Sequence, residues 1–160
     1  MKISLVSALV VITMAMAAPA LAQEQQSAGT VDIESNEMEI LETNKTAIFR
    51  GDVVAKRPND TIRCEEMLVT YKDVQKQDGS TSTEVEKIDC TGSVKIRTGT
   101  QDITGNKALF LLLQDKLTVT GNVTVVQDKT VLKGPQLYVD LKTKRTRMAG
   151  GRVKGKFVPK

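Results

Sequence analysis

Apolar and polar residues alternate along most of the chain after residue 30, and glycines interrupt the alternation at similar distances. These glycines are Gly51, Gly92, Gly121 and Gly151, spaced 41, 29 and 30 residues apart. A valine follows each glycine by two residues, and apolar or aromatic residues stand sixteen, eighteen and twenty residues after the first three. A period of two is typical of β-strands with one buried face. A recurring unit of this length is typical of stacked supersecondary repeats.

The repeat predicts a stack of antiparallel β-hairpins, in which each glycine forms a turn that opens a unit. Strands are expected over 31–42, 46–56, 61–71, 85–97, 102–113, 117–126, 130–141 and 145–157. Residues 57–60 combine Pro with Asn and Asp, which favours a tight turn. The longer first spacing comes from residues 72–83, whose Asp-Gly and Ser/Thr composition predicts an inserted hairpin tip. Residues 108–113 could form a helical turn by periodicity alone, but their place in the repeat favours a strand.

The first 22 residues have the pattern of a secretory signal peptide. Lys2 precedes an apolar run, and the run ends in Ala20-Leu21-Ala22, a small-residue cleavage site. A retained membrane anchor is the alternative, but the run is shorter than the ~20 apolar residues that a bilayer requires. The domain prediction is therefore a cleaved signal peptide over 1–22, a flexible segment over 23–30 and one β-domain over 31–160. The mature protein is expected outside the cytoplasm.

Charge is distributed unevenly between the two ends of the predicted domain. Residues 23–44 contain six acidic residues and no basic one, whereas residues 141–160 contain eight basic residues and no acidic one. Such runs are commonly solvated faces. The alternative is electrostatic steering between opposite ends of neighbouring molecules. The mature chain has 22 basic and 19 acidic residues; this balance and the lack of an aromatic-rich basic patch do not predict nucleic-acid binding.

The sequence offers little material for catalysis. It contains no histidine, so the common Ser-His and Cys-His pairs and imidazole metal sites are excluded. Glu65-Glu66 and the pair Glu84/Glu86 could act as acid and base, but such residues more often form the solvent face of strands. No phosphate-binding or calcium-binding loop is recognisable. We expect no enzyme activity, no metal and no cofactor.

The two cysteines have two alternative interpretations. An exported chain with two cysteines can form a disulfide, here between Cys64 and Cys90. Alternatively, both are buried thiols that pack as small apolar residues. Both positions belong to the predicted inner face of neighbouring repeats, so the role is structural in either case.

The shared inner face of the stack also has two alternative interpretations. If two sheets close tightly, the face is an ordinary dry core, and the pattern alone favours this reading. If they splay into a V, the face becomes an apolar channel. Each CH₂ group buried there would contribute ~0.8 kcal/mol, so a lipid with several acyl chains could be held without covalent chemistry.

Two motifs resemble a known family. Ile33-Glu34-Ser35-Asn36 followed by 49–54 (Phe-Arg-Gly-Asp-Val-Val), and 120–123 (Thr-Gly-Asn-Val) followed by 132–139, resemble the order and spacing in the OstA/LptA family. The resemblance extends over about 31–158. It implies a single V-shaped β-jellyroll of stacked antiparallel strands, in the all-β class, and periplasmic transport of lipopolysaccharide.

The resemblance also implies partners and positions. Lipid A acyl chains would occupy the apolar interior, and jellyrolls would join head to tail into a bridge from an inner-membrane LptC-like protein to an outer-membrane LptD-like protein. By position, the acyl-contacting residues would be Val31, Ile33, Phe49, Val94, Ile96, Phe110 and Leu112. The 72–83 insertion and the two cysteines depart from the best-known members, which affects the expected geometry of the second repeat.

The open strand edges are expected at residues 31–42 and 152–158, because unpaired edges invite strand addition. Ile33 and Ile40 would belong to the first edge, and Val153 and Phe157 to the second. Two alternatives to the lipid bridge remain. One is a structural or adhesion module that binds only protein, and the other is a membrane-anchored LptC-like relative.

Overall fold

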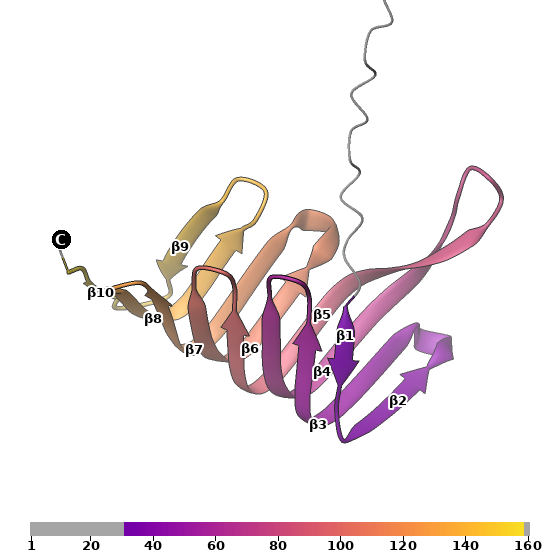
Figure 1. The fold of residues 1–160 in the computed structure, drawn as a ribbon, viewed down its shortest axis with the longest axis horizontal. Coiled ribbons are helices and arrows are strands. Elements are labelled where there is room, and N and C mark those ends of the chain that lie inside the picture. Colours follow the sequence, from indigo (N-terminus) through magenta and orange to yellow (C-terminus); the bar gives the residue numbers. More distant parts are fainter. Residues whose placement is uncertain (1–30, 159–160) are drawn as a thin grey trace, which may run out of the picture.

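The computed structural model describes residues 31–158, which form one antiparallel sheet of ten strands (Figure 1). The strands follow the chain in order and pair as neighbours from β3 to β8, so the all-β prediction is confirmed. Their bounds are β1 Asp32–Glu34, β2 Glu37–Leu41, β3 Thr46–Lys56, β4 Thr61–Gln75, β5 Thr81–Arg97, β6 Asp102–Leu111, β7 Lys116–Gln127, β8 Thr130–Asp140, β9 Arg145–Ala149 and β10 Lys154–Lys156. Short 3-10 turns lie at Glu42–Asn44 (η1) and Leu112–Gln114 (η2).

Bends divide the sheet into two walls. The pairing register shifts at the middle of β3, β5 and β7, between Arg50 and Val53, Thr91 and Val94, and Thr120 and Val123. Each shift contains a glycine and a small polar residue with positive φ, such as Gly121 (φ 83) and Asn122 (φ 49). Such β-bulges bend strands, and glycine and asparagine tolerate this backbone. Gly51, Gly92 and Gly121 are therefore bends inside continuous strands, not the turns predicted from the sequence.

The two walls enclose the interior from opposite sides. Wall A contains the strand halves next to β2 and β9, and its hairpin tips lie at 42–45, 76–80, 112–115 and 141–144. Wall B contains the halves next to β1 and β10, and its tips lie at 57–60, 98–101 and 128–129. Figure 1 shows the tips of both walls on the same side and the bends on the other. The result is the V-shaped jellyroll that the resemblance implies.

Apolar side chains line the inside of the V in rows that cross the whole sheet. In wall B one row runs through the paired residues Ile33, Ala55, Ile62, Ile96, Ile103, Val125, Leu132 and Gly155. In wall A one row runs through Met38, Phe49, Met67, Cys90, Ala108, Val119, Leu137 and Met148, and the next through Ile40, Ala47, Val69, Ile88, Phe110, Leu117, Val139 and Thr146. Middle residues of these rows, together with Val53, Cys64, Val94 and Val123 beside the bends, form the buried core.

The inserted segment is mostly strand. β4 continues to Gln75 and β5 begins at Thr81, so only 76–80 form the tip of a hairpin that projects beyond its neighbours (Figure 1). Asp73, in the projecting part of this hairpin, forms an ion pair with Lys45, with 2.7 Å between Lys45 Nζ and Asp73 Oδ2. The predicted 72–83 loop was therefore too long.

The 108–113 segment is a strand up to Leu111 and then turns into η2, so its last residues were assigned wrongly. The predicted signal peptide over 1–22 and the predicted flexible segment over 23–30 lie outside the described residues. Within 31–158, no helix has the length and apolar character needed to cross a bilayer.

Candidate apolar groove

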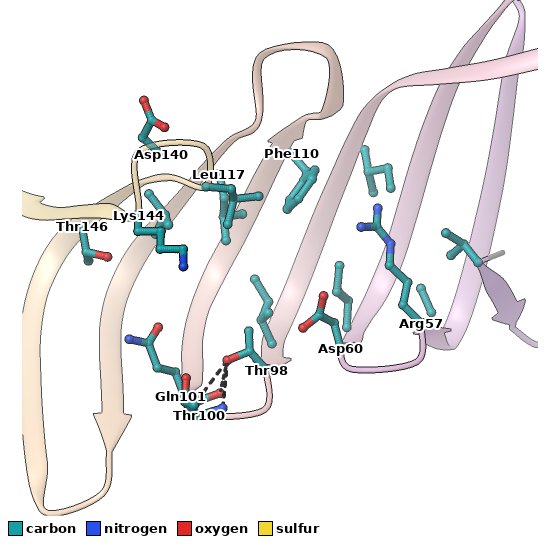
Figure 2. Close-up of a pocket in the computed structure, with 17 residues that line it drawn as sticks. Arg57, Asp60, Thr98, Thr100, Gln101, Phe110, Leu117, Asp140, Lys144 and Thr146 are labelled. Carbon is teal, nitrogen blue, oxygen red and sulfur yellow. Dashed lines mark hydrogen bonds between the residues drawn. The ribbon is translucent and has the colours of Figure 1, made fainter. Parts of the chain in front are cut away.

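The open side of the V contains a groove with a volume of about 480 Å³. Apolar residues of both walls form its sides, and the residues from wall A and wall B face one another across it (Figure 2). The apolar lining residues are Val31, Ala55, Ile62, Ile88, Ile96, Phe110, Leu117, Val139 and Leu141. The interior is thus neither a closed dry core nor an empty channel: it is packed at the bends and open toward the hairpin tips.

Polar residues gather where the groove opens. Arg57, Asp60, Thr98, Thr100 and Gln101 come from the turns of wall B. Asp140, Lys144 and Thr146 come from the β8–β9 connection of wall A. The Thr98 side chain holds its turn together, because its Oγ1 accepts a hydrogen bond of 3.1 Å from the backbone N–H of Gln101 (Figure 2). The groove therefore has an apolar floor and a polar mouth.

The residues predicted to contact acyl chains occupy three kinds of position. Val31, Ile96 and Phe110 line the groove. Ile33, Phe49 and Leu112 are half-buried and pack against the core without lining it. Val94 is only 1% exposed and lies next to the bend of β5, where a ligand could not reach it without displacing the core.

Several lining residues were absent from the prediction. Ile62, Ile88, Leu117 and Val139 belong to the same period-two pattern as the predicted residues, so the pattern could have found them. Arg57 and Lys144 carried no such signal. They lie in turns that are 87 residues apart in sequence, and only the bend of the sheet brings both to one groove.

Cys64 and Cys90 are buried and free in this structure, with no disulfide between them. In the pairing register Cys64 lies opposite Val53 and Cys90 lies opposite Met67, so neither cysteine is the direct cross-strand partner of the other. The Cys64 thiol donates to the backbone oxygen of Glu66 at 3.2 Å. Hydrogen bonding with Cys64, followed by burial, raises the pKa of the Cys90 thiol, which keeps it protonated and of low reactivity.

The sheet ends in strands that have a neighbour on one side only. These are β1 and β2 at one end and β9 and β10 at the other. Ile33 lies in β1 and Ile40 in β2, whereas Val153 and Phe157 flank β10. The predicted C-terminal strand over 145–157 is broken between β9 and β10, at Gly150 and Gly151, where the chain crosses from wall A to wall B.

Both ends of the sheet expose inward-facing apolar residues. In β2, Met38 and Ile40 are 58% and 51% exposed although their rows are buried further along. At the other end Phe157 is 70% exposed. Because such side chains belong to the inner face, their exposure means that the apolar surface of the interior continues to both ends of the described sheet.

The described part of the chain contains no cluster of three or more side chains that could hold a metal ion. The fold and the site therefore define an open, two-walled β-jellyroll with an apolar groove and exposed strand edges. The model of the LptA/(LptD N-terminal domain) LPS transport proteins matches residues 32–145. The chain belongs to this family of lipopolysaccharide transport proteins.

The proteins similar to this chain include one from Rhizobium meliloti and one from Pseudomonas aeruginosa. One is an uncharacterized protein of Rhizobium meliloti (strain 1021), which is 28% identical over 132 residues, covering 81% of this chain and 71% of that protein. The other is LptH of Pseudomonas aeruginosa, described as the LptA homologous periplasmic component of the lipopolysaccharide transport device. Its crystal structure matches with a TM-score of 0.69 and 13% identity, over 82% of this chain and 96% of LptH. At that identity the likeness shows the fold alone.

Proposed function

We propose that this protein binds lipopolysaccharide by its acyl chains in the groove and carries it between the inner and outer membranes. The observation that carries the proposal is the groove itself, about 480 Å³ with apolar sides and an opening along the hairpin tips. Acyl chains gain ~0.8 kcal/mol for each CH₂ group transferred from water. An open-sided groove lets a bulky polar headgroup stay in water while the chains are buried.

The strand directions support a head-to-tail assembly. β9 runs from the tip of wall A toward the bend, and β2 runs from the bend toward the tip. β10 runs from the bend toward the tip of wall B, and β1 runs the opposite way. If β9 of one molecule is placed beside β2 of the next, and β10 beside β1, both new pairs are antiparallel. The alternation of the sheet then continues across the junction.

Continuing the rows gives the register of that junction. Met148 would lie opposite Met38 of the next molecule, and Gly155 opposite Ile33. In this register three outward-facing bases meet three acids of the next molecule. The pairs are Arg147 with Glu39, Lys154 with Glu34, and Lys156 with Asp32.

The charge arrangement favours this junction over pairing of like ends. Within residues 31–158, Arg147, Lys154 and Lys156 have no ion-pair partner. Glu34 and Glu39 pair with Lys56 and Arg50 of their own chain but remain 70% and 48% exposed. Two acidic or two basic ends would repel each other, so charge sets the polarity of the assembly.

The proposed setting is the periplasm, reached through the signal peptide. The same edges would receive an LptC-like protein of the inner membrane at one end of the bridge and an LptD-like protein of the outer membrane at the other. A protein-binding module without lipid would need the edges but not the groove. The apolar lining of the groove is what favours the lipid function.

The substitution Phe110→Glu tests the lipid function. A carboxylate in the middle of the groove should abolish lipopolysaccharide binding by the purified protein while leaving self-association unchanged. Tyr138→Glu is the matched control, since Tyr138 is on the outer face of wall A and 40% exposed. Circular dichroism verifies that both variants fold. Undiminished binding by Phe110→Glu would place the lipid elsewhere and contradict the proposal.

A further inference from the structure

Arg57 reaches across the groove from one wall to the other. It lies in the β3–β4 turn of wall B, and its guanidinium carbon is 5.7 Å from the ring centroid of Phe110 in wall A. Figure 2 shows the side chain rising from its turn toward that ring. A cation over an aromatic face is attracted by the ring quadrupole. The contact therefore holds a half-buried positive charge above the apolar floor.

The Arg57 guanidinium has N–H donors that are available to a ligand. Arginine carries five N–H donors in a planar fork and no acceptor. Within residues 31–158 it makes no salt bridge, although Asp60 lies in the same turn. Among the described residues no side-chain hydrogen bond of Arg57 occupies these N–H groups, so they stay available for an anion.

Lys144 supplies a second cation from the opposite wall. It belongs to the β8–β9 tip and lines the same groove, with its side chain directed down toward the Thr98–Gln101 turn (Figure 2). Its neighbour Asp140 is engaged locally, because its Oδ1 accepts a 2.8 Å hydrogen bond from the backbone N–H of Thr143. This bond holds the pKa of Asp140 below its ordinary value. The carboxylate is therefore bound within its own turn.

We propose that Arg57 and Lys144 are two cationic contacts at the groove mouth, together called the anion site, that bind phosphate groups on the headgroup of the bound lipid. The site rests on the proposed function, because the acyl chains on the apolar floor would bring the headgroup to the mouth. Arginine binds phosphate through two parallel N–H···O bonds, and lysine adds a point charge. Thr98, Thr100 and Gln101 provide polar neighbours at the same rim.

The site predicts discrimination between lipids that differ only in phosphate. Binding of lipid A is measured against enzymatically dephosphorylated lipid A with the same acyl chains, using the purified mature protein. The wild type should bind the phosphorylated lipid roughly tenfold more tightly or better, as expected for charge-assisted hydrogen bonds. Arg57→Gln combined with Lys144→Gln should remove this preference and keep the affinity for the dephosphorylated lipid.

Lys95→Gln is the matched control, because Lys95 is exposed on the outer face of wall B beside Ile96. This variant should keep the wild-type preference. Equal affinity of the wild type for the two lipids, or an unchanged preference in the double variant, would overturn the anion site. Neither result would contradict binding of the acyl chains in the groove. Failure of the wild type to bind either lipid would overturn the proposed function and the anion site with it.

Discussion

Met38 and Met148 occupy the two ends of one inward-facing row of the sheet, each without a neighbour on its outer side. Most side chains of the row between them are buried in the core of wall A. A strand added at either end would continue it, and the antiparallel directions of β2 and β9 make this possible between copies of the chain. This relationship defines how one molecule can extend another.

Cysteines at the two positions test the register of the junction. When Met38→Cys and Met148→Cys are combined and Cys64 and Cys90 are replaced by Ala, mild oxidation should produce ladders of covalent oligomers. Residues directly opposite in an antiparallel pair have Cβ atoms within about 5.5 Å, a separation that a disulfide can span with small adjustments. Denaturing electrophoresis without reductant reads the result.

Each single-cysteine variant is the control for this experiment. Met38→Cys alone should remain monomeric in the gel, since its partner in the junction is Met148 and not a second Met38. Efficient dimers from either single variant would indicate pairing of like ends and contradict the head-to-tail junction.

The basic end should be required for association but not for folding. Deleting residues 152–160 removes β10 and leaves β8 paired with β7 and β9, so a folded chain that sediments as a monomer is expected. Arg147→Glu should weaken association of the full chain, and so should high salt, because exposed charges are screened. Lys129→Glu, at the β7–β8 tip, is the control with the same charge change and should associate normally. Oligomers of undiminished size after the deletion would rule out this edge.

The bends should be intolerant of side chains. Gly121 has φ 83, and an added Cβ would approach the Asn106 side chain to 2.5 Å. Alanine there should lower the free energy of unfolding by more than the ~1–2 kcal/mol cost of a left-handed backbone. Gly79 (φ 82) has open space and isolates the backbone cost, whereas Gly99 lacks both constraints. Urea titrations should rank the losses as Gly121→Ala, then Gly79→Ala, then Gly99→Ala; any other order would refute the assigned role of the bend.

The arm formed by β4 and β5 should respond to acid through Asp73. A hydrogen bond and ion pair with Lys45 hold the pKa of Asp73 below its ordinary value of 3.8. A pKa lower in the folded than in the unfolded chain means that the pairing stabilises the fold above that ordinary value. The contribution disappears as the pH falls through the folded pKa. Wild type and Asp73→Asn should therefore differ in stability at neutral pH and converge in acid, and NMR titration should give Asp73 a pKa under 3.8.

Much of this structure follows from local patterns. The period-two alternation identified the strands and their inner face, and the repeat gave their order and hence the antiparallel neighbours. Its first and last strands also fall at the two ends of the sheet. These features depend on residues close in sequence, so a single chain contains the signal for them.

Other features depend on how the sheet bends. A Gly-Asn pair reads equally well as a hairpin turn or as a bulge inside a strand, and only the pairing partners of the flanking residues distinguish the two. The meeting of Arg57 and Phe110 across the groove follows from that bend. The same holds for Cys64 and Cys90, since their inner-face positions were foreseen but the register that sets each opposite another residue was not.

Photo-crosslinking in intact cell envelopes tests the central claim most directly. A photoreactive residue at position 110 or 96 should form an adduct with lipopolysaccharide, because both side chains line the groove. The same residue at position 109 or 95, one step along each strand and therefore on the opposite face, should form none. Adducts at 110 and 96 alone would support transport through the groove. Adducts confined to 109 and 95, or equal at all four positions, would contradict it.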